Sequence, residues 1–266
     1  EREVGAELFT RTSRKVALTL AGTALVRHAR SILAQYDRSM LEIREIAAGR
    51  SGVLEIGATG SILRGGLADL MAQFRLRHPG ITLRVHEQSP ATQITEVIAH
   101  RTDVSFNRSP ARDDELSFEL AWREEMVALL PRNHRLAEKD SLAIEDLRHD
   151  DHVVLNPDSS EFATHIMSFL VAAGCRPRVS QQVVDAQSIP SLIVAGFGVS
   201  IVPSSITQLT SGPLVFRPIR PNPPVSDVFM VYHRHDQGPT LKTFLHTMRD
   251  ILRDRGQNHR FAPDMA

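Results

Sequence analysis

The chain has 266 residues, and its 31 basic side chains balance its 31 acidic ones, so the formal net charge is zero. This balance does not indicate a protein that binds nucleic acid over its whole surface. The length is enough for two domains, or for one domain of two lobes. No apolar run could span a bilayer, the first residues do not resemble a signal peptide, and the single cysteine, Cys175, can form no internal disulfide. We therefore expect a cytoplasmic protein with no membrane partner.

The first segment predicts a β-hairpin over residues 8–19. Residues 1–5 before it are typical of the end of a helix, which indicates that further residues precede them in the protein. The hairpin carries Arg14 and Lys15 at its tip and Arg11 just before it. Basic side chains at such a tip can contact a phosphate backbone, which supplies affinity without sequence information. An ordinary solvated turn explains the same residues equally well.

A long amphipathic helix is predicted over residues 19–50, with Thr19 as its N-cap. Its apolar positions alternate by threes and fours, a spacing typical of helices that pair side by side. No other long helix precedes it, so we expect it to pair with a second copy of the chain, with packing on its own domain as the alternative. Gly49 and Gly52 indicate a hinge after the helix. The residues expected at the pairing face are Leu25, Ala29, Ile32, Tyr36 and Ile43.

Residues 53–87 predict a strand, a turn, a helix and a second strand, a unit that normally contains two parallel strands. The turn contains Thr59, Gly60 and Ser61. It falls at the carboxyl edge of the sheet and at a helix N-terminus, where free amides favour an anion. We therefore expect the turn to hold an acidic small molecule. The alternative is that Ser61 only caps the helix.

The rest of the chain alternates strands with helices, which indicates an α/β fold. The strand at residues 102–106 leads to Arg108, at the edge where open α/β sheets bind ligands. A guanidinium can hold a carboxylate through two parallel hydrogen bonds, whereas the alternative is a surface arginine. The last helix is expected over residues 240–253, followed by a mobile tail at 256–266.

Signals for catalysis or for a metal are weak. The run His149-Asp150-Asp151-His152 has no second cluster at ligand spacing. The run Gly196-Phe197-Gly198 lacks the third glycine of a dinucleotide-binding fingerprint, and Gly198-Val199-Ser200 lacks the second glycine of a nucleophile elbow. We therefore expect no enzyme, no metal and no cofactor.

Two motifs carry a resemblance to a known family. Residues 8–11, LFTR, followed by a basic turn and VALTLAG at residues 16–22, resemble the wing and linker-helix start of LysR-type transcriptional regulators. Residues 195–203, AGFGVSIVP, look like the family's A-G-x-G-I-x-x-x-P motif. The likeness extends over essentially the whole chain. It implies a cytoplasmic bacterial regulator with a dimerising helix and an effector domain like a periplasmic binding protein, commonly assembled as a tetramer.

The resemblance also implies partners and a division of the chain. The partners would be promoter DNA, a small carboxylate effector and further copies of the chain, with RNA polymerase as another candidate. Residues 1–18 would be the remnant of a winged helix-turn-helix, and 19–50 the linker helix. Residues 52–255 would be the effector domain. Lobe I would comprise residues 52–122 and 227–255, and lobe II residues 123–226.

Within the family, the chain looks closest to regulators of aromatic-compound catabolism that sense muconate or benzoate. Its Gly60-Ser61, its Phe106-Asn107-Arg108 and its residues 162–167, FATHIM, match that branch's G-S, F-G-R and F-S-T-H-V-M. Pro90 departs from the branch, which has a threonine hydroxyl there. A solute-binding protein of a transport system is the alternative from another class. The resemblance implies an effector site made of Thr59, Gly60, Ser61, Arg108, Phe162 and Val202.

Overall fold

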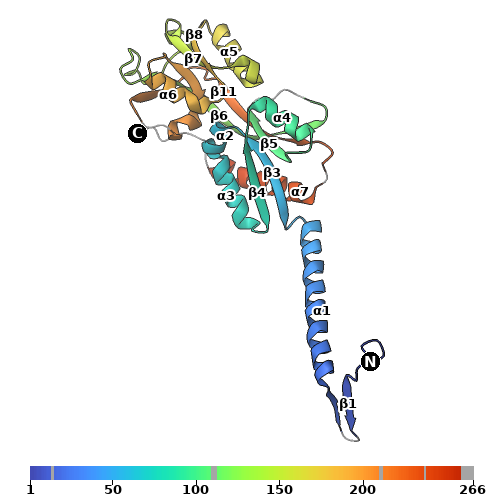
Figure 1. Ribbon diagram of the computed structural model, residues 1–266. Coiled ribbons are helices and arrows are strands. Elements are labelled where there is room, and N and C mark those ends of the chain that lie inside the picture. The colour runs from blue at the N-terminus through green and yellow to red at the C-terminus, as the bar shows by residue number, and fades with distance from the viewer. Residues whose placement is uncertain (13–14, 109–112, 210–211, 237, 259–266) are drawn as a thin grey trace.

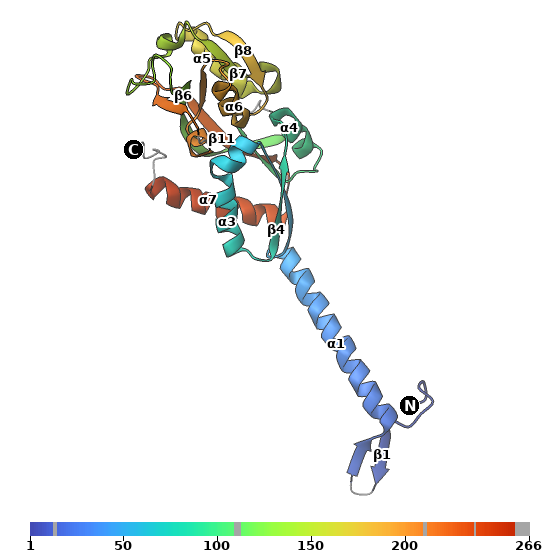
Figure 2. The ribbon, with the colours of Figure 1, turned by 60° about the vertical axis from the view of Figure 1, so that its left-hand side comes forward.

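The protein is an α/β body with a long helix projecting from it (Figure 1). The computed structural model describes residues 1–12, 15–108, 113–209, 212–236 and 238–258. At the far end of the helix lies a small hairpin, and Figure 2 shows the same extended arrangement after rotation. Among the described residues, no helix combines the length and apolar character needed to cross a membrane.

The hairpin and the long helix predicted at the start of the chain are both confirmed. Strands β1 (Phe9–Thr12) and β2 (Lys15–Leu18) pair antiparallel. Helix α1 (Leu20–Ala47) begins after Thr19, whose hydroxyl accepts a hydrogen bond from the Gly22 amide at 2.9 Å. Of the residues expected to contact DNA, Arg14 lies outside the described residues, as do the side chains of Arg11 and Lys15.

The expected hinge after α1 is packed against the start of the last helix, α7 (Pro239–Asn258). Gly49 has φ +66°, and a Cβ there would lie 2.5 Å from the Pro239 carbonyl oxygen. Gly52 has φ +145°, and a Cβ there would lie 3.0 Å from the Thr240 hydroxyl oxygen. The glycines therefore allow both a turn of the chain and a close approach to α7.

The first lobe is built on three parallel strands, as the unit at residues 53–87 predicts. Strand β3 lies between β4 and β5, and β11 continues the sheet antiparallel to β5. Helices α3 and α7 pack on one face, where the rings of Phe74 and Phe244 meet with centroids 5.0 Å apart, and α4 packs on the other. The bounds are β3 (Gly52–Ala58), α3 (Ala68–Arg77), β4 (Ile81–Glu87), α4 (Pro90–Ile98), β5 (Val104–Arg108) and β11 (Val225–His233).

The second lobe surrounds the far half of strand β6 (Leu116–Pro131), which pairs antiparallel with both β9 and β10. Strands β7 and β8 form a separate parallel pair. Apolar clusters cover both faces of the β6 segment, one against α5 and the other against α6. The bounds are β7 (Asp151–Leu155), α5 (Glu161–Ala172), β8 (Arg178–Val183), α6 (Ile189–Val194), β9 (Ser200–Pro203) and β10 (Leu214–Pro218). Short 3-10 turns lie at Ile144–Leu147, Pro157–Ser159, Ala186–Ser188 and Ser204–Leu209.

Strand β6 runs through both lobes and joins them, and β11 begins where the lobes meet, with Val225 paired to Glu125. The near half of β6 pairs with β11 beside β5, and its far half belongs to the second lobe. The predicted fold class, a two-lobed α/β body after a long helix, is confirmed. The segment boundaries expected from the sequence stay predictions.

Three details differ from the expectations. The first helix after β3 is broken into α2 (Gly60–Ile62), a π turn (Leu63–Leu67) and α3, because Gly66 adopts φ +131°. Strand β6 begins about ten residues earlier than residue 126, the expected start. Helix α7 continues to Asn258, beyond its expected end at residue 253, since one glycine weakens a helix without ending it. The remainder of the expected tail, 259–266, lies outside the described residues.

Candidate ligand-binding site between the lobes

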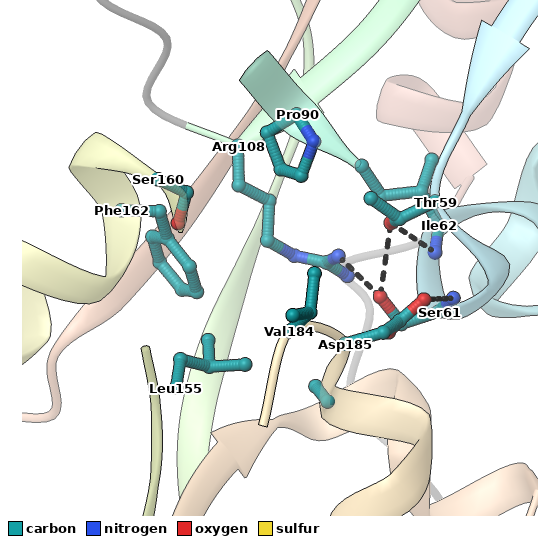
Figure 3. A pocket seen from close by; sticks show the side chains of 11 residues that line it. Thr59, Ser61, Ile62, Pro90, Arg108, Leu155, Ser160, Phe162, Val184 and Asp185 are labelled. Atoms are coloured by element: carbon teal, nitrogen blue, oxygen red, sulfur yellow. Dashed lines mark hydrogen bonds between the residues drawn. The ribbon is translucent and has the colours of Figure 1, made fainter. Parts of the chain in front are cut away.

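A small cavity lies between the two lobes at the carboxyl ends of β3 and β5 (Figure 3). Its volume is about 30 Å³, which is room for only about two water molecules. The sequence-predicted residues Thr59, Ser61, Arg108 and Phe162 all contribute to its wall. The first lobe supplies Thr59, Ser61, Ile62, Pro90 and Arg108; the second supplies Leu155, Ser160, Phe162, Val184, Asp185 and Ala186.

A larger outer cavity adjoins the first and shares Pro90, Arg108 and Ser160 with it. Its volume is about 320 Å³. Pockets for small ligands are commonly about 300–1,000 Å³, so the outer cavity alone is at the lower end of that range. Its remaining wall is Ala91, Ile94, Asn107, Pro157, Asp158, Ser159 and Glu161.

The turn after β3 is closed by Thr59 and not by Ser61. The Thr59 hydroxyl oxygen accepts from the Ile62 amide at 3.4 Å and lies 3.1 Å from the Ser61 hydroxyl oxygen. Ser61 is therefore not the helix cap, and its hydroxyl group lines the cavity. A Cβ at Gly60 would lie 2.5 Å from a carboxylate oxygen of Glu87, so a larger residue there would displace the end of that side chain.

Arg108, the last residue of β5, is almost fully buried beneath the cavity. Its Nε donates to the Ser226 hydroxyl at 2.8 Å, and its Nη1 donates to the Ser61 hydroxyl at 3.1 Å. Its Nη2 donates to a carboxylate oxygen of Glu124 at 2.9 Å. A guanidinium has five N–H groups, so two of them have no partner within the described part of the chain. Arg108 can therefore still bind a ligand.

Glu124 is a site residue that the sequence analysis missed. It lies on β6 and is only 3% exposed. Its second oxygen accepts from the Ser205 amide at 3.0 Å and from the Ser204 hydroxyl at 3.5 Å. The sequence did contain a signal for Glu124, because it lies on the same face of the strand as the buried Met126 and Ala128. A carboxylate buried there requires a cationic partner. The positive charge of Arg108 is thus already balanced within the protein.

Asp185 in the second lobe is a further residue that the sequence analysis missed. One of its oxygens accepts from the Ser61 amide at 3.2 Å, and the other accepts from the Gln187 amide at 3.1 Å. The Gln187 side chain in turn donates to Glu87 at 3.1 Å. The amide that we expected to face an acidic ligand is therefore bonded to the protein's own carboxylate. The Ser61–Asp185 and Gln187–Glu87 hydrogen bonds connect the two lobes across the cavity.

Val202 does not lie at the cavity, contrary to the expectation. It belongs to β9, pairs with Val127 and is fully buried in an apolar cluster of the second lobe. The AGFGVSIVP motif therefore contributes to the core. Gly60 likewise contributes through close packing, whereas Phe162 presents its ring to the cavity (Figure 3).

The weak histidine signal has a structural role. The His152 ring is buried, and its Nε2 lies 3.0 Å from the Leu147 carbonyl oxygen. Burial lowers the pKa of His152 below its usual range. Burial also raises the pKa of the neighbouring Cys175 thiol. Within the described ranges, no group of three or more histidine, cysteine or acidic side chains could hold a metal ion.

Comparison with known proteins decides the family. A family model described as the LysR substrate binding domain matches residues 47–253. The chain belongs to the LysR family. It is 30% identical over 249 residues to the HTH-type transcriptional regulator AlsR of Bacillus subtilis strain 168, with 92% of this chain and 82% of that protein covered.

Solved structures of LysR proteins share the fold. Full-length CbnR complexed with its target DNA superposes with a TM-score of 0.83 at 25% identity, covering 94% of this chain and 86% of CbnR. The BenM effector binding domain with its effector benzoate gives a TM-score of 0.67 at 22% identity, covering 79% of this chain and 96% of that domain. AlsR, CbnR and BenM are each described as transcriptional regulators, and none of the three is described as a solute-binding protein of a transport system.

Proposed function

We propose that this LysR-family regulator senses a small organic acid in the cavity between its lobes. The observation that carries the proposal is the convergence of Thr59, Ser61 and Arg108 from two strand ends on one cavity. The ligand would accept from the two unpaired N–H groups of Arg108 and from the hydroxyl groups of the turn. Such charge-assisted hydrogen bonds are about twice as strong as neutral ones.

The apolar part of the wall supports a ligand with a carbon skeleton, such as an acid from aromatic catabolism. Leu155, Phe162 and Val184 face the Arg108 side of the cavity (Figure 3). The similar BenM domain supports the same ligand class, since its effector is benzoate. Pro90 lies in the wall and offers no side-chain hydroxyl, so a muconate-like pair of carboxylates would lack one polar contact here.

We further propose that α1 pairs with a second copy of the chain. Its apolar side chains are exposed, with Ile32 at 67% and Ile43 at 59%, and an exposed apolar stripe of this length favours association. Promoter DNA, contacted through the hairpin residues Arg11, Arg14 and Lys15, is the proposed partner at the other end of α1, with RNA polymerase as another candidate. Assembly as a tetramer and a cytoplasmic location are part of the same proposal, as are the lobe boundaries predicted above.

Isothermal titration with benzoate, cis,cis-muconate and succinate tests the acid-sensing site. We expect one acid to bind, and Ser61→Ala to weaken its affinity about tenfold, because one hydroxyl partner is lost. Ser191→Ala, an exposed serine on α6, is the matched control and should leave the affinity unchanged. Equal affinity in Ser61→Ala and the wild type would place the ligand elsewhere. No binding by any of the acids would refute the proposed effector class.

A further inference from the structure

We propose that the effector carries a positively charged group in addition to its carboxylate, as in an amino acid or an amino-substituted acid. The inference rests on the proposed function and narrows the ligand class of the same site. It comes from the balance of charge around the two cavities, which an acid without a cationic group would not satisfy.

The described walls of the two cavities contain three carboxylates and one cation. The carboxylates are Asp185 in the inner cavity and Asp158 and Glu161 in the outer one. The cation is Arg108, and its charge is balanced by the buried Glu124 at 2.9 Å. A ligand that fills both cavities therefore meets a surplus of negative charge.

The three carboxylates have no internal cation of their own. None of them forms an ion pair within 4.0 Å among the described residues, although Asp185 accepts from two backbone amides. Asp158 and Glu161 are exposed at the outer cavity and keep their hydration until a ligand covers them. Covering a carboxylate without an opposite charge is unfavourable, so the ligand itself is expected to supply the charge.

A second, independent observation favours a ligand that carries a hydrogen-bond donor in the outer cavity. Asn107 lines the outer cavity and is only 1% exposed. Its amide nitrogen donates to the Ser105 hydroxyl at 2.8 Å, but its side-chain carbonyl oxygen is buried with no hydrogen-bond partner in the described parts of the chain. Buried acceptors are almost always paired. An ammonium N–H in the outer cavity would satisfy it.

The two requirements fit one molecule whose carboxylate and ammonium lie at opposite ends. Arg108 lines both cavities, so a carboxylate on its free N–H groups leaves the rest of the ligand in the outer cavity. There the ammonium meets Asp158, Glu161 and the Asn107 oxygen. A dianion in the same position would bring its second carboxylate against like charges, which disfavours it.

The test uses pairs of acids that differ only by an ammonium group. Butyrate is compared with 4-aminobutyrate, and 4-methylbenzoate with 4-(aminomethyl)benzoate, by isothermal titration of the whole chain. We expect the amino member of at least one pair to bind about tenfold more tightly. Asp158→Asn with Glu161→Gln should reduce that ratio towards one. Glu138→Gln with Asp140→Asn removes two exposed charges outside the cavities and should leave the ratio unchanged.

The outcomes separate this inference from the proposed function. Tighter binding of the plain acid in both pairs would overturn the inference and leave the acid-sensing site intact. Butylamine binding as tightly as 4-aminobutyrate would show that the carboxylate contributes nothing and would overturn both. A ratio that is equal in the wild type and the Asp158/Glu161 variant would also overturn the inference, because the preference would then arise elsewhere. No binding by any of these compounds would overturn both.

Discussion

Removing the guanidinium of Arg108 is expected to destabilise the effector domain, apart from any effect on ligand binding. In Arg108→Ala, the buried Glu124 would lose the only cation within 4.0 Å among the described residues. The two side chains are 7% and 2% exposed, so water does not replace the lost partner. What would remain to the carboxylate are the Ser205 amide and the Ser204 hydroxyl.

The expected size of the effect follows from this burial. Breaking a buried pair by removing one partner typically costs about 3–5 kcal/mol, whereas replacing both partners by apolar residues is often neutral or even stabilising. We therefore expect Arg108→Ala to lose about 3–5 kcal/mol in the free energy of unfolding. The double variant Arg108→Met with Glu124→Met should lose much less. Both variants remove the same hydrogen bonds to the Ser226 and Ser61 hydroxyl groups, so these losses do not account for the difference.

Urea unfolding followed by circular dichroism measures the prediction. With a slope of about 2–3 kcal/mol per molar urea, Arg108→Ala should lower the midpoint by about 1–2 M. The single variants Arg108→Met and Glu124→Met complete the double-mutant cycle and give the coupling energy between the two positions. Arg249→Ala, which breaks an exposed ion pair with Glu119, is the matched control and should shift the midpoint very little. A midpoint for Arg108→Ala equal to that of the double variant would refute the reasoning.

The remaining predictions concern pairing, pH and one glycine. Ile32→Asp with Ile43→Asp should halve the molar mass of the smallest stable assembly in light scattering, whereas Arg30→Asp on the same helix should not; an unchanged mass would exclude α1 as the pairing element. Because burial lowers the pKa of His152, the unfolded state takes up its proton first as the pH falls below about 6.5. Stability should therefore drop between pH 7.5 and 5 by more in the wild type than in His152→Gln; equal pH dependence of the urea midpoint would contradict the assigned burial effect. Gly66→Ala should lower the melting temperature by more than Gly238→Ala does. The reason is that Gly66 has φ +131°, whereas Gly238 has no positive φ. Equal losses in the two variants would argue against backbone strain at Gly66.

Much of the fold could be predicted because local patterns and tertiary packing agree. The seven-residue spacing of α1, the cap at Thr19 and the alternation of β4 are each determined within a few residues of the chain. The break after Ile62 was missed, since Gly65-Gly66 is a pair of residues that a helix tolerates at some cost. The early part of β6 was missed as well, although Leu116 and Phe118 alternate with polar residues as an exposed strand does.

Only those residues of the candidate site that lie at strand ends could be predicted from the sequence. Thr59, Ser61 and Arg108 follow strands, and parallel strands bring their carboxyl ends to one edge. Glu124 and Asp185 depend on tertiary contacts over 16 and 124 residues of sequence separation, which no local pattern specifies. Val202 was assigned to the site because it lies in a motif that resembles one of the family. Its side chain faces the core, since such a motif can reflect packing as well as ligand binding.

The size of the inner cavity constrains how a ligand could regulate the protein. A volume of about 30 Å³ is much smaller than an organic acid, so a ligand whose carbon skeleton entered the inner cavity, and not only the outer one, would require an arrangement in which the inner cavity is wider. Widening it separates Phe162 and Asp185 of one lobe from Ser61 of the other, and the Ser61–Asp185 hydrogen bond is then lost. The ligand carboxylate can take the place of the Asp185 carboxylate at the Ser61 amide, so the exchange conserves the hydrogen bond while it changes the angle between the lobes. A ligand shifts an equilibrium only by its difference in affinity for the two arrangements, and that difference would be large for a ligand that fits only the wider one.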